Sequence, residues 1–222
     1  MTNPVAQARF NMVEQQIRPW EVFDPKVLKL LEELPREAFV PEEYLHLAYA
    51  DIEIPIGHNQ AMMLPRVEAK LLQALDLKPS DQVLEVGTGS GFLTACLARL
   101  SKRVVSIDIH EEFTRLAGER LDRQGISNAL LRAGDALAGP LDEEGPFDAI
   151  AVTGSLPDEA QCELFRRQLK PGGRLFVVVG KKPVMEAFLI TRLAGQGFSE
   201  ERLFETLLAP LEHAEPPPTF EF

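Results

Sequence analysis

The stretch around residue 85 constrains the fold of this 222-residue chain more than any other. Three glycines at alternate positions, Gly87, Gly89 and Gly91, follow the apolar run 83–86, and residues 92–100 place apolar side chains at helical spacing. This order predicts a strand, a tight turn and a helix. Glycine permits backbone conformations and a close ligand approach that other residues resist, and the start of a helix offers free N–H groups. The stretch therefore predicts a cofactor-binding turn.

The spacing of the glycines bears on which cofactor this turn binds. A dinucleotide-binding turn has glycines at its first, third and sixth positions, and the sixth position here is Phe92. A second apolar run ends at Asp108, about where a carboxylate accepts hydrogen bonds from two ribose hydroxyls. The residues thus indicate an adenosine cofactor and argue against a nicotinamide one, so an oxidoreductase is kept only as a distant alternative.

Beyond residue 79, strand-like and helix-like segments alternate. Parallel strands are expected at 83–86, 104–107, 129–131, 147–152 and 175–179, with two antiparallel edge strands at 186–193 and 201–208. The order predicts an α/β fold, a doubly wound Rossmann-like sheet. Its carboxyl edge should gather Gly87, Asp108, Asp135 and Thr153 at one site.

The residues before this sheet predict a helical extension that also covers the site. Helices are expected at 6–17, 24–34, 42–48 and 65–75, with extended chain and a turn at 51–60. The division that follows is residues 1–78 for the extension and cover, 79–215 for the core and 216–222 for a Pro-rich tail. Four aromatic residues either help to close the site or pack the extension: Trp20, Phe23, Phe39 and Tyr49.

Composition limits the partners and the location. The net charge is −11 and no Lys/Arg cluster is present, which argues against broad binding to nucleic acid or anionic membranes. The first ten residues are polar and no apolar run approaches membrane-spanning length, so a cytoplasmic protein is expected. Cys96 and Cys162 lie in apolar helical contexts, which predicts buried free thiols and no metal site.

Several motifs resemble a known family. The order Glu-x-Gly-x-Gly-x-Gly from Glu85 to Gly91 resembles the first motif of class I S-adenosylmethionine-dependent methyltransferases. From about Phe10 to Pro210 the chain is similar to the protein-L-isoaspartate O-methyltransferase family, and the segments that carry this likeness are 12–18 (MVEQQIR), 35–41 (PREAFVP), 56–57 (IG), 83–91 (VLEVGTGSG) and 172–175 (GGRL). The resemblance implies methyl transfer from S-adenosylmethionine to the carboxylate of isoaspartyl residues in damaged proteins or peptides, the first step of their repair.

The resemblance also implies where the cofactor binds, with Asp108 on the ribose and Asp135 and Ala136 near the adenine. The complete set of expected cofactor-binding residues is Met62, Met63, Glu85, Gly87, Thr88, Gly89, Ser90, Gly91, Asp108, Ile109, Asp135 and Ala136. Two alternatives stay open: Glu85 either holds the glycine turn or meets a cationic group, and Asp135 either accepts from the adenine or only forms a turn. No catalytic residue is assigned, because a carboxylate acceptor is already ionised and needs alignment rather than a base.

One segment departs from the family pattern Gly-x-Gly-Gln-Thr-Ile-Ser-x-Pro, since residues 57–65 read GHNQAMMLP. Ala61 and Met63 replace two hydroxyl residues, and losing one donor that orients an anion typically lowers a rate by about 10²–10³. Three hypotheses follow: an isoaspartyl methyltransferase, a methyltransferase of the same fold with another acceptor suited by Met62 and Met63, or a cofactor-binding protein without turnover. His58 is either a substitute donor or a solvent-facing turn residue.

Overall fold

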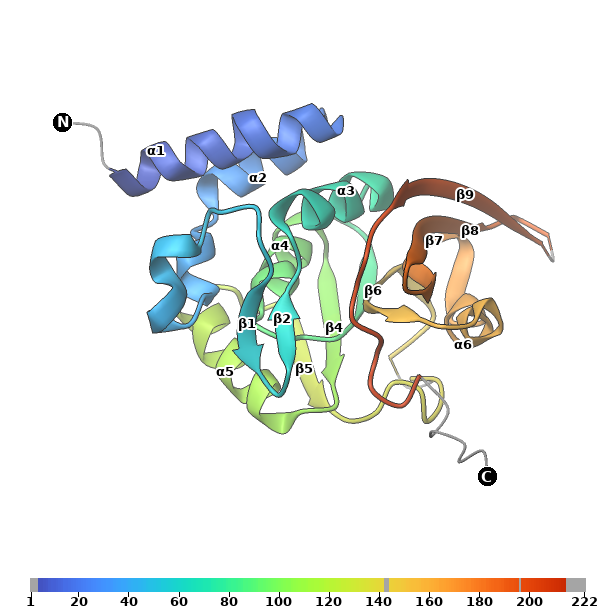
Figure 1. Cartoon of the computed structure of the whole chain (residues 1–222). Coiled ribbons are helices and arrows are strands. Elements are labelled where there is room, and N and C mark those ends of the chain that lie inside the picture. Colours follow the sequence, from blue (N-terminus) through green and yellow to red (C-terminus); the bar gives the residue numbers. More distant parts are fainter. Residues whose placement is uncertain (1–3, 142–143, 196, 215–222) are drawn as a thin grey trace, which may run out of the picture.

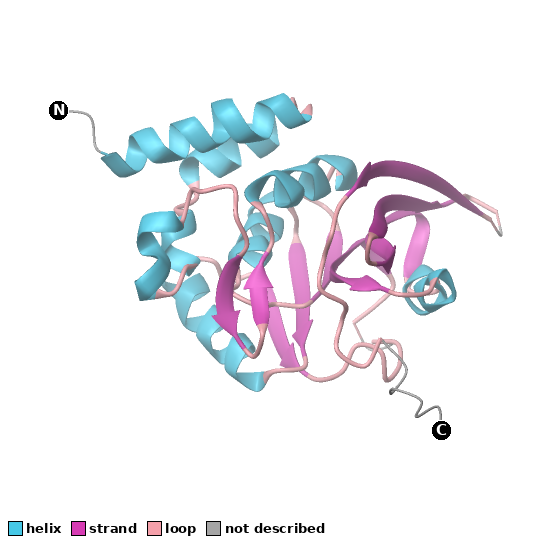
Figure 2. Ribbon diagram, viewed as in Figure 1, coloured by secondary structure: helices cyan, strands magenta, loops and turns pink. Residues whose placement is uncertain are grey.

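The computed structural model describes residues 4–141, 144–195 and 197–214, and the expected Pro-rich tail lies outside them. Its centre is a seven-stranded sheet with the order β5-β4-β3-β6-β7-β8-β9, in which β8 pairs antiparallel with both β7 and β9 and all other neighbours pair parallel (Figures 1 and 2). The strands are β3 (Gln82–Val86), β4 (Arg103–Asp108), β5 (Ala129–Ala133), β6 (Phe147–Leu156), β7 (Leu169–Lys181), β8 (Val184–Arg192) and β9 (Phe198–Glu205). The predicted α/β architecture and the two antiparallel edge strands are confirmed.

Helices and a small hairpin surround this sheet. The α-helices are α1 (Pro4–Asn11), α2 (Pro25–Glu33), α3 (Pro65–Leu75), α4 (Phe92–Leu100), α5 (Glu111–Arg123) and α6 (Cys162–Arg166). The shorter turns are the π-helix η1 (Met12–Ile17) and the 3₁₀ turns η2 (Arg18–Trp20), η3 (Arg36–Phe39), η4 (Glu42–Leu47) and η5 (Glu159–Gln161), and the hairpin is formed by β1 (Ile54–Gly57) and β2 (Gln60–Met62). In the described part of the chain, no helix is long and apolar enough to cross a bilayer.

Both faces of the sheet are buried. Consecutive residues of β3 show this directly, because Val83 belongs to the hydrophobic cluster under α2, α3 and α4, whereas Leu84 belongs to the cluster under α6. Val13 of the N-terminal extension joins the same cluster as Val83, so the extension and the sheet share one core. Cys96 and Cys162 lie one in each cluster as buried free thiols, as predicted.

Several boundaries differ from the sequence prediction. The helix expected at 6–17 changes at residue 12 into a π-helix, whose wider turn accompanies burial of Met12, Val13 and Ile17. The strand expected at 147–152 continues to Leu156, because Ser155 and Leu156 still pair with β7, and Ser155 also donates its N–H to the carbonyl of Ala209 at 2.8 Å. That partner lies more than fifty residues away in the sequence, so no local pattern shows the extra pairing.

A third boundary differs after β6. The strand expected at 175–179 already begins at Leu169, which pairs with Phe147. Leu169 also lies at helical spacing from Cys162 and Phe165 of α6, but that helix ends at Arg166. Leu169 is fully buried in the strand as it would have been in the helix. Burial alone therefore does not distinguish the two assignments, and an apolar residue at this spacing fits both.

Candidate cofactor-binding site

The β1–β2 hairpin stands over the glycine turn of β3. Its two connecting residues, His58 and Asn59, have φ of 50° and 57°, and positive φ at both central positions gives the turn that matches the twist of paired strands. Both are among the non-glycine residues that adopt this conformation most readily. A Cβ placed on Gly89 would lie 3.1 Å from Cδ1 of Ile56, so the hairpin approaches the turn closely.

The glycine turn serves the fold as well as a ligand. Gly87, with φ of 96°, faces β6 so closely that a Cβ there would lie 2.1 Å from Thr153 Oγ1. Gly91, with φ of 85°, begins α4, and a Cβ there would lie 2.8 Å from the Cβ of Ala117 on α5. Side chains at these two positions would therefore push β6 and α5 away.

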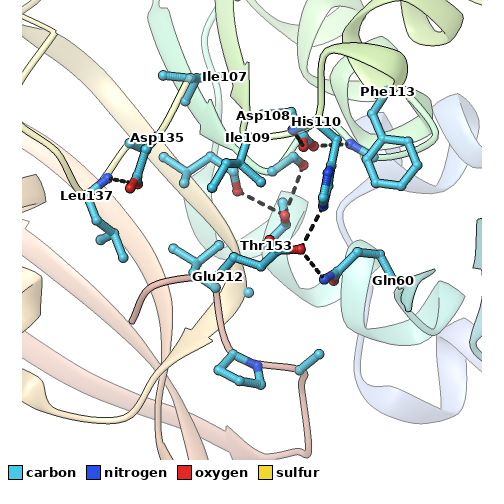
Figure 3. A pocket seen from close by; sticks show the side chains of 18 of the residues that line it. Gln60, Ile107, Asp108, Ile109, His110, Phe113, Asp135, Leu137, Thr153 and Glu212 are labelled. Carbon is cyan, nitrogen blue, oxygen red and sulfur yellow. Dashed lines mark hydrogen bonds and ion pairs between the residues drawn. The ribbon is translucent and has the colours of Figure 1, made fainter. Parts of the chain in front are cut away.

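The larger lobe of the site is a cavity of about 110 Å³ at the carboxyl edge of the sheet (Figure 3). Asp108 lies at the end of β4, where its Oδ2 accepts the N–H of Gly89 and its Oδ1 accepts the N–H of His110, each at 2.9 Å. Asp135 follows β5, and its Oδ1 accepts the N–H of Leu137 at 2.8 Å. Each carboxylate oxygen has further lone pairs, so both acids can also accept from the hydroxyls or amino group of a nucleoside.

A smaller lobe of about 50 Å³ continues this cavity beneath the hairpin. Five residues line both lobes: Ile56, Ala61, Gly87, Gly89 and Thr153. The smaller lobe is completed by Met62, Met63, Glu68, Thr88, Ser90 and Leu93. The two lobes together form an elongated site that passes directly over the glycine turn.

Glu85 lies behind the site rather than in it. Its side chain is fully buried, and its Oε2 accepts hydrogen bonds from Thr94 and Ser106, each at 2.5 Å. The hydroxyl of Ser106 is 2.6 Å from that of Thr88, which connects Glu85 to the turn. Burial raises the pKa of Glu85 to about 8. This geometry supports the first of its two predicted roles, that of holding the glycine turn.

A C-terminal segment closes the larger lobe from the other side. This strap (residues 206–214) follows β9 and descends past β6 towards the end of the sheet to which the arrows of β4 and β5 point (Figure 1). Glu212 Oε1 lies 2.6 Å from His110 Nε2 and accepts from Gln60 Nε2 at 3.2 Å (Figure 3). His213 Nδ1 lies 2.8 Å from Asp135 Oδ2, and this hydrogen bond raises the pKa of His213.

Most of the expected residues line the two lobes. Those in the larger lobe are Gly87, Gly89, Asp108, Ile109, Asp135 and Ala136, and those in the smaller lobe are Met62, Met63, Gly87, Thr88, Gly89 and Ser90. Glu85 and Gly91 line neither, and act through the packing described above. Their contact with a cofactor, like that of the others, stays a prediction. Glu68, Glu212 and His213 were not predicted from the sequence, because no motif marks them.

The structure shows the surroundings of His58, Phe39 and Trp20, for each of which the sequence left two roles open. His58 stacks on His110 with ring centroids 4.1 Å apart, lies 2.9 Å from Glu112, and lines neither lobe. Phe39 packs edge-on against Phe92, and the ring of Trp20 lies under the guanidinium of Arg66. These contacts favour packing over site closure for the two aromatic residues.

Comparison with known proteins agrees with this geometry. The family model of protein-L-isoaspartate(D-aspartate) O-methyltransferase matches residues 7–215. The chain belongs to this family. A protein-L-isoaspartate O-methyltransferase of Syntrophus aciditrophicus is 40% identical over 194 residues, which are 87% of this chain and 88% of the relative. One from Gloeobacter violaceus is 35% identical over 92% of this chain and 98% of its own length.

Solved structures of family members share the fold. A crystal structure from Plasmodium falciparum, described as a protein-L-isoaspartate O-methyltransferase in complex with S-adenosyl-L-homocysteine, superposes with a TM-score of 0.79 at 22% identity and covers 95% of this chain and 99% of its own. A second protein-L-isoaspartate O-methyltransferase structure has a TM-score of 0.79 at 26% identity, covering 93% of this chain and 66% of its own. The predicted family and Rossmann-like methyltransferase fold are thus confirmed.

Proposed function

We propose that this protein is an S-adenosylmethionine-dependent methyltransferase that esterifies the free carboxylate of isoaspartyl residues in damaged proteins. The observation that carries the proposal is the family match over residues 7–215, on a chain whose two-lobed cavity lies where the glycine turn meets two acids. Asp108 and Asp135 in the larger lobe suit the hydroxyls and amino group of an adenosine. Gly87 and Gly89 line both lobes without side chains, so the rest of the ligand can approach the main chain closely there.

The chain's own contribution to the reaction is alignment and exclusion of water. Bound in this cavity, S-adenosylmethionine supplies an electrophilic methyl group on a positively charged sulfur. An isoaspartyl carboxylate is ionised at neutral pH, so the chain need not remove a proton from it. Ile56 and Ala61 of the hairpin wall one side of the larger lobe, and Leu208 to Glu212 of the strap wall the other. Two walls that limit water favour a step in which opposite charges cancel.

A second candidate function is methyl transfer to a different, less polar acceptor. Ala61 is exposed and lines both lobes, and Met63 is buried and lines the smaller one. Neither side chain can donate a hydrogen bond to a carboxylate. Methionine adapts to irregular apolar shapes, so this wall also suits an apolar acceptor.

A methyl-transfer assay separates these functions. The protein is incubated with methyl-labelled S-adenosylmethionine and an isoaspartyl peptide, with the same peptide carrying ordinary aspartate as the control. We expect a base-labile methyl ester in the isoaspartyl peptide only. If calorimetry detects cofactor binding while neither peptide is labelled, the isoaspartyl function is wrong. Labelling of another acceptor in a cell extract would then support the second candidate, and no labelling there would indicate a cofactor-binding protein without turnover.

Two variants of Ala61 test how much the missing hydroxyl lowers the rate of methyl transfer. Ala61→Thr restores a donor at that position, and Ala61→Val has the same shape without the hydroxyl. We expect Ala61→Thr to methylate the isoaspartyl peptide faster than Ala61→Val, by up to about 10²-fold if the hydroxyl orients the acceptor. Equal rates for the two variants would show that this position does not contact the acceptor.

A further inference from the structure

The smaller lobe contains a buried carboxylate that the activity outlined above does not use. Glu68 of α3 is the sole ionisable residue in the lining of this lobe as far as the structure describes it. Its side chain is 4% exposed, and its Oε2 pairs with Nη1 of Arg36. Its other oxygen, Oε1, has no hydrogen-bond partner within the described residues.

The pair with Arg36 fixes this carboxylate in place. The guanidinium of Arg36 also donates to the carbonyl of Met63 at 2.9 Å and lies 4.6 Å from the centre of the Phe92 ring. Three elements, η3, α3 and the start of α4, are therefore joined at one buried cation. Even with this partner, burial raises the pKa of Glu68 to about 7, so the ionised carboxylate is incompletely compensated.

The shape of the cavity indicates which part of the ligand reaches Glu68. The two acids that suit an adenosine line the larger lobe, and the cavity continues past Gly87 and Gly89 into the smaller one. The part of an adenosyl amino acid that extends beyond the ribose therefore enters the smaller lobe. That part ends in an α-carboxylate and an α-ammonium group, and of the two only the ammonium can pair with a carboxylate, because it is a cation that needs an anionic partner when it leaves water.

We propose that Oε1 of Glu68 binds the α-ammonium group of S-adenosylmethionine and of S-adenosylhomocysteine. The inference rests on the proposed function and assigns a cofactor-binding residue outside the glycine turn. Glu85 is the nearest alternative, since it too is a buried carboxylate with one unpartnered oxygen, but it does not line either lobe. Asp108 lines only the larger lobe, where it suits the hydroxyls of the adenosine.

Calorimetry with two ligands tests this contact. The ligands are S-adenosylhomocysteine and an analogue in which hydrogen replaces the α-amino group, and the proteins are the wild type and Glu68→Gln. A charge-assisted hydrogen bond to a buried group predicts that the analogue binds the wild type roughly 10- to 100-fold more weakly than S-adenosylhomocysteine. In Glu68→Gln, the affinity for S-adenosylhomocysteine should fall by a similar factor, and that for the analogue should stay within about twofold.

A matched control separates this contact from a loss of stability. Asp81 also pairs with a largely buried arginine, Arg174, at 2.6 Å, but it lies just before β3, at the opposite edge of the sheet from the cavity. Asp81→Asn should lower the melting temperature as Glu68→Gln does, and should leave the affinity for both ligands unchanged.

The outcomes are distinguishable. If Glu68→Gln weakens both ligands equally, or neither, Glu68 is only a structural partner of Arg36 and the inference is wrong. If the variant does not fold, the wild type still decides, because equal affinities for the two ligands would show that the ammonium makes no contact. If the wild type binds neither ligand, the proposed function itself fails.

Discussion

The close contact between Gly87 and Thr153 predicts a specific cost for Gly87→Ala. The new Cβ would lie 2.1 Å from Oγ1 of Thr153 and 3.5 Å from its Cβ, so only the hydroxyl has to move. That hydroxyl lies 2.9 Å from the carbonyl oxygens of both Val86 and Gly87, and turning it away loses these contacts.

The magnitude has two separable parts. A non-glycine residue at a φ of 96° costs about 1–3 kcal/mol. Displacing the hydroxyl of Thr153 adds about 0.5–1.5 kcal/mol for an off-rotamer side chain and a similar amount for its lost hydrogen bond. We expect Gly87→Ala to lower the free energy of unfolding by about 2–6 kcal/mol in the wild type, and by only about 1–3 kcal/mol in Thr153→Ala.

Urea unfolding of the four proteins of this cycle, followed by circular dichroism, measures the difference. Gly125→Ala is the matched control, because Gly125 has a φ of 66° and nothing within 4 Å of its Cβ position. Its cost should be the same with and without Thr153→Ala. If Gly87→Ala lowers the free energy of unfolding equally in the wild type and in Thr153→Ala, the close contact with Thr153 is not the cause.

Three further predictions concern buried ionisable groups. Burial raises the pKa of Glu85 to about 8, above its value in an unfolded chain, so the wild type should lose stability as the pH rises from about 4.5 to 8. In urea titrations over that range, Glu85→Gln should become more stable relative to the wild type. Arg36→Met leaves Glu68 buried without its partner and should lower the free energy of unfolding by about 3–5 kcal/mol, whereas Arg36→Met with Glu68→Met should recover most of this loss. In Cys96→Ala, burial raises the pKa of the remaining thiol, Cys162, to about 11, so a thiol reagent should react only as the protein unfolds.

Each of these three has an outcome that contradicts it. A stability difference between Glu85→Gln and the wild type that does not change with pH would mean that Glu85 titrates normally. A double variant as unstable as Arg36→Met would show that the unpaired Glu68 is not the cause. Rapid labelling of Cys162 in native buffer, at a rate that urea does not change, would contradict its burial.

The sheet and the larger lobe were predictable because they depend on short-range patterns. Gly87, Asp108, Asp135 and Thr153 each come at the end of an apolar run in the sequence, and parallel strands bring such residues to one edge. The missing hydroxyl at position 61 was also predictable, because Ala61 occupies a position within a recognisable sequence motif.

The remaining features depend on contacts that no local pattern encodes. Glu68 lies between the buried Val67 and Ala69, and only the buried Arg36 explains a carboxylate there. The strap contacts the hairpin through Glu212 and Gln60, which are 152 residues apart in the sequence. Such pairings follow from the tertiary fold and not from helix or strand periodicity.

The position of the strap has a consequence for the timing of a catalytic cycle. His110 and Glu212 both line the larger lobe and are in contact, so a nucleoside bound there as proposed would be expected to leave only after this contact separates. Release of the demethylated cofactor would then limit the steady-state rate, while a single turnover would be faster. A steady-state rate that slows in viscous solvent, beside a first turnover that does not, would be the kinetic signature of this arrangement.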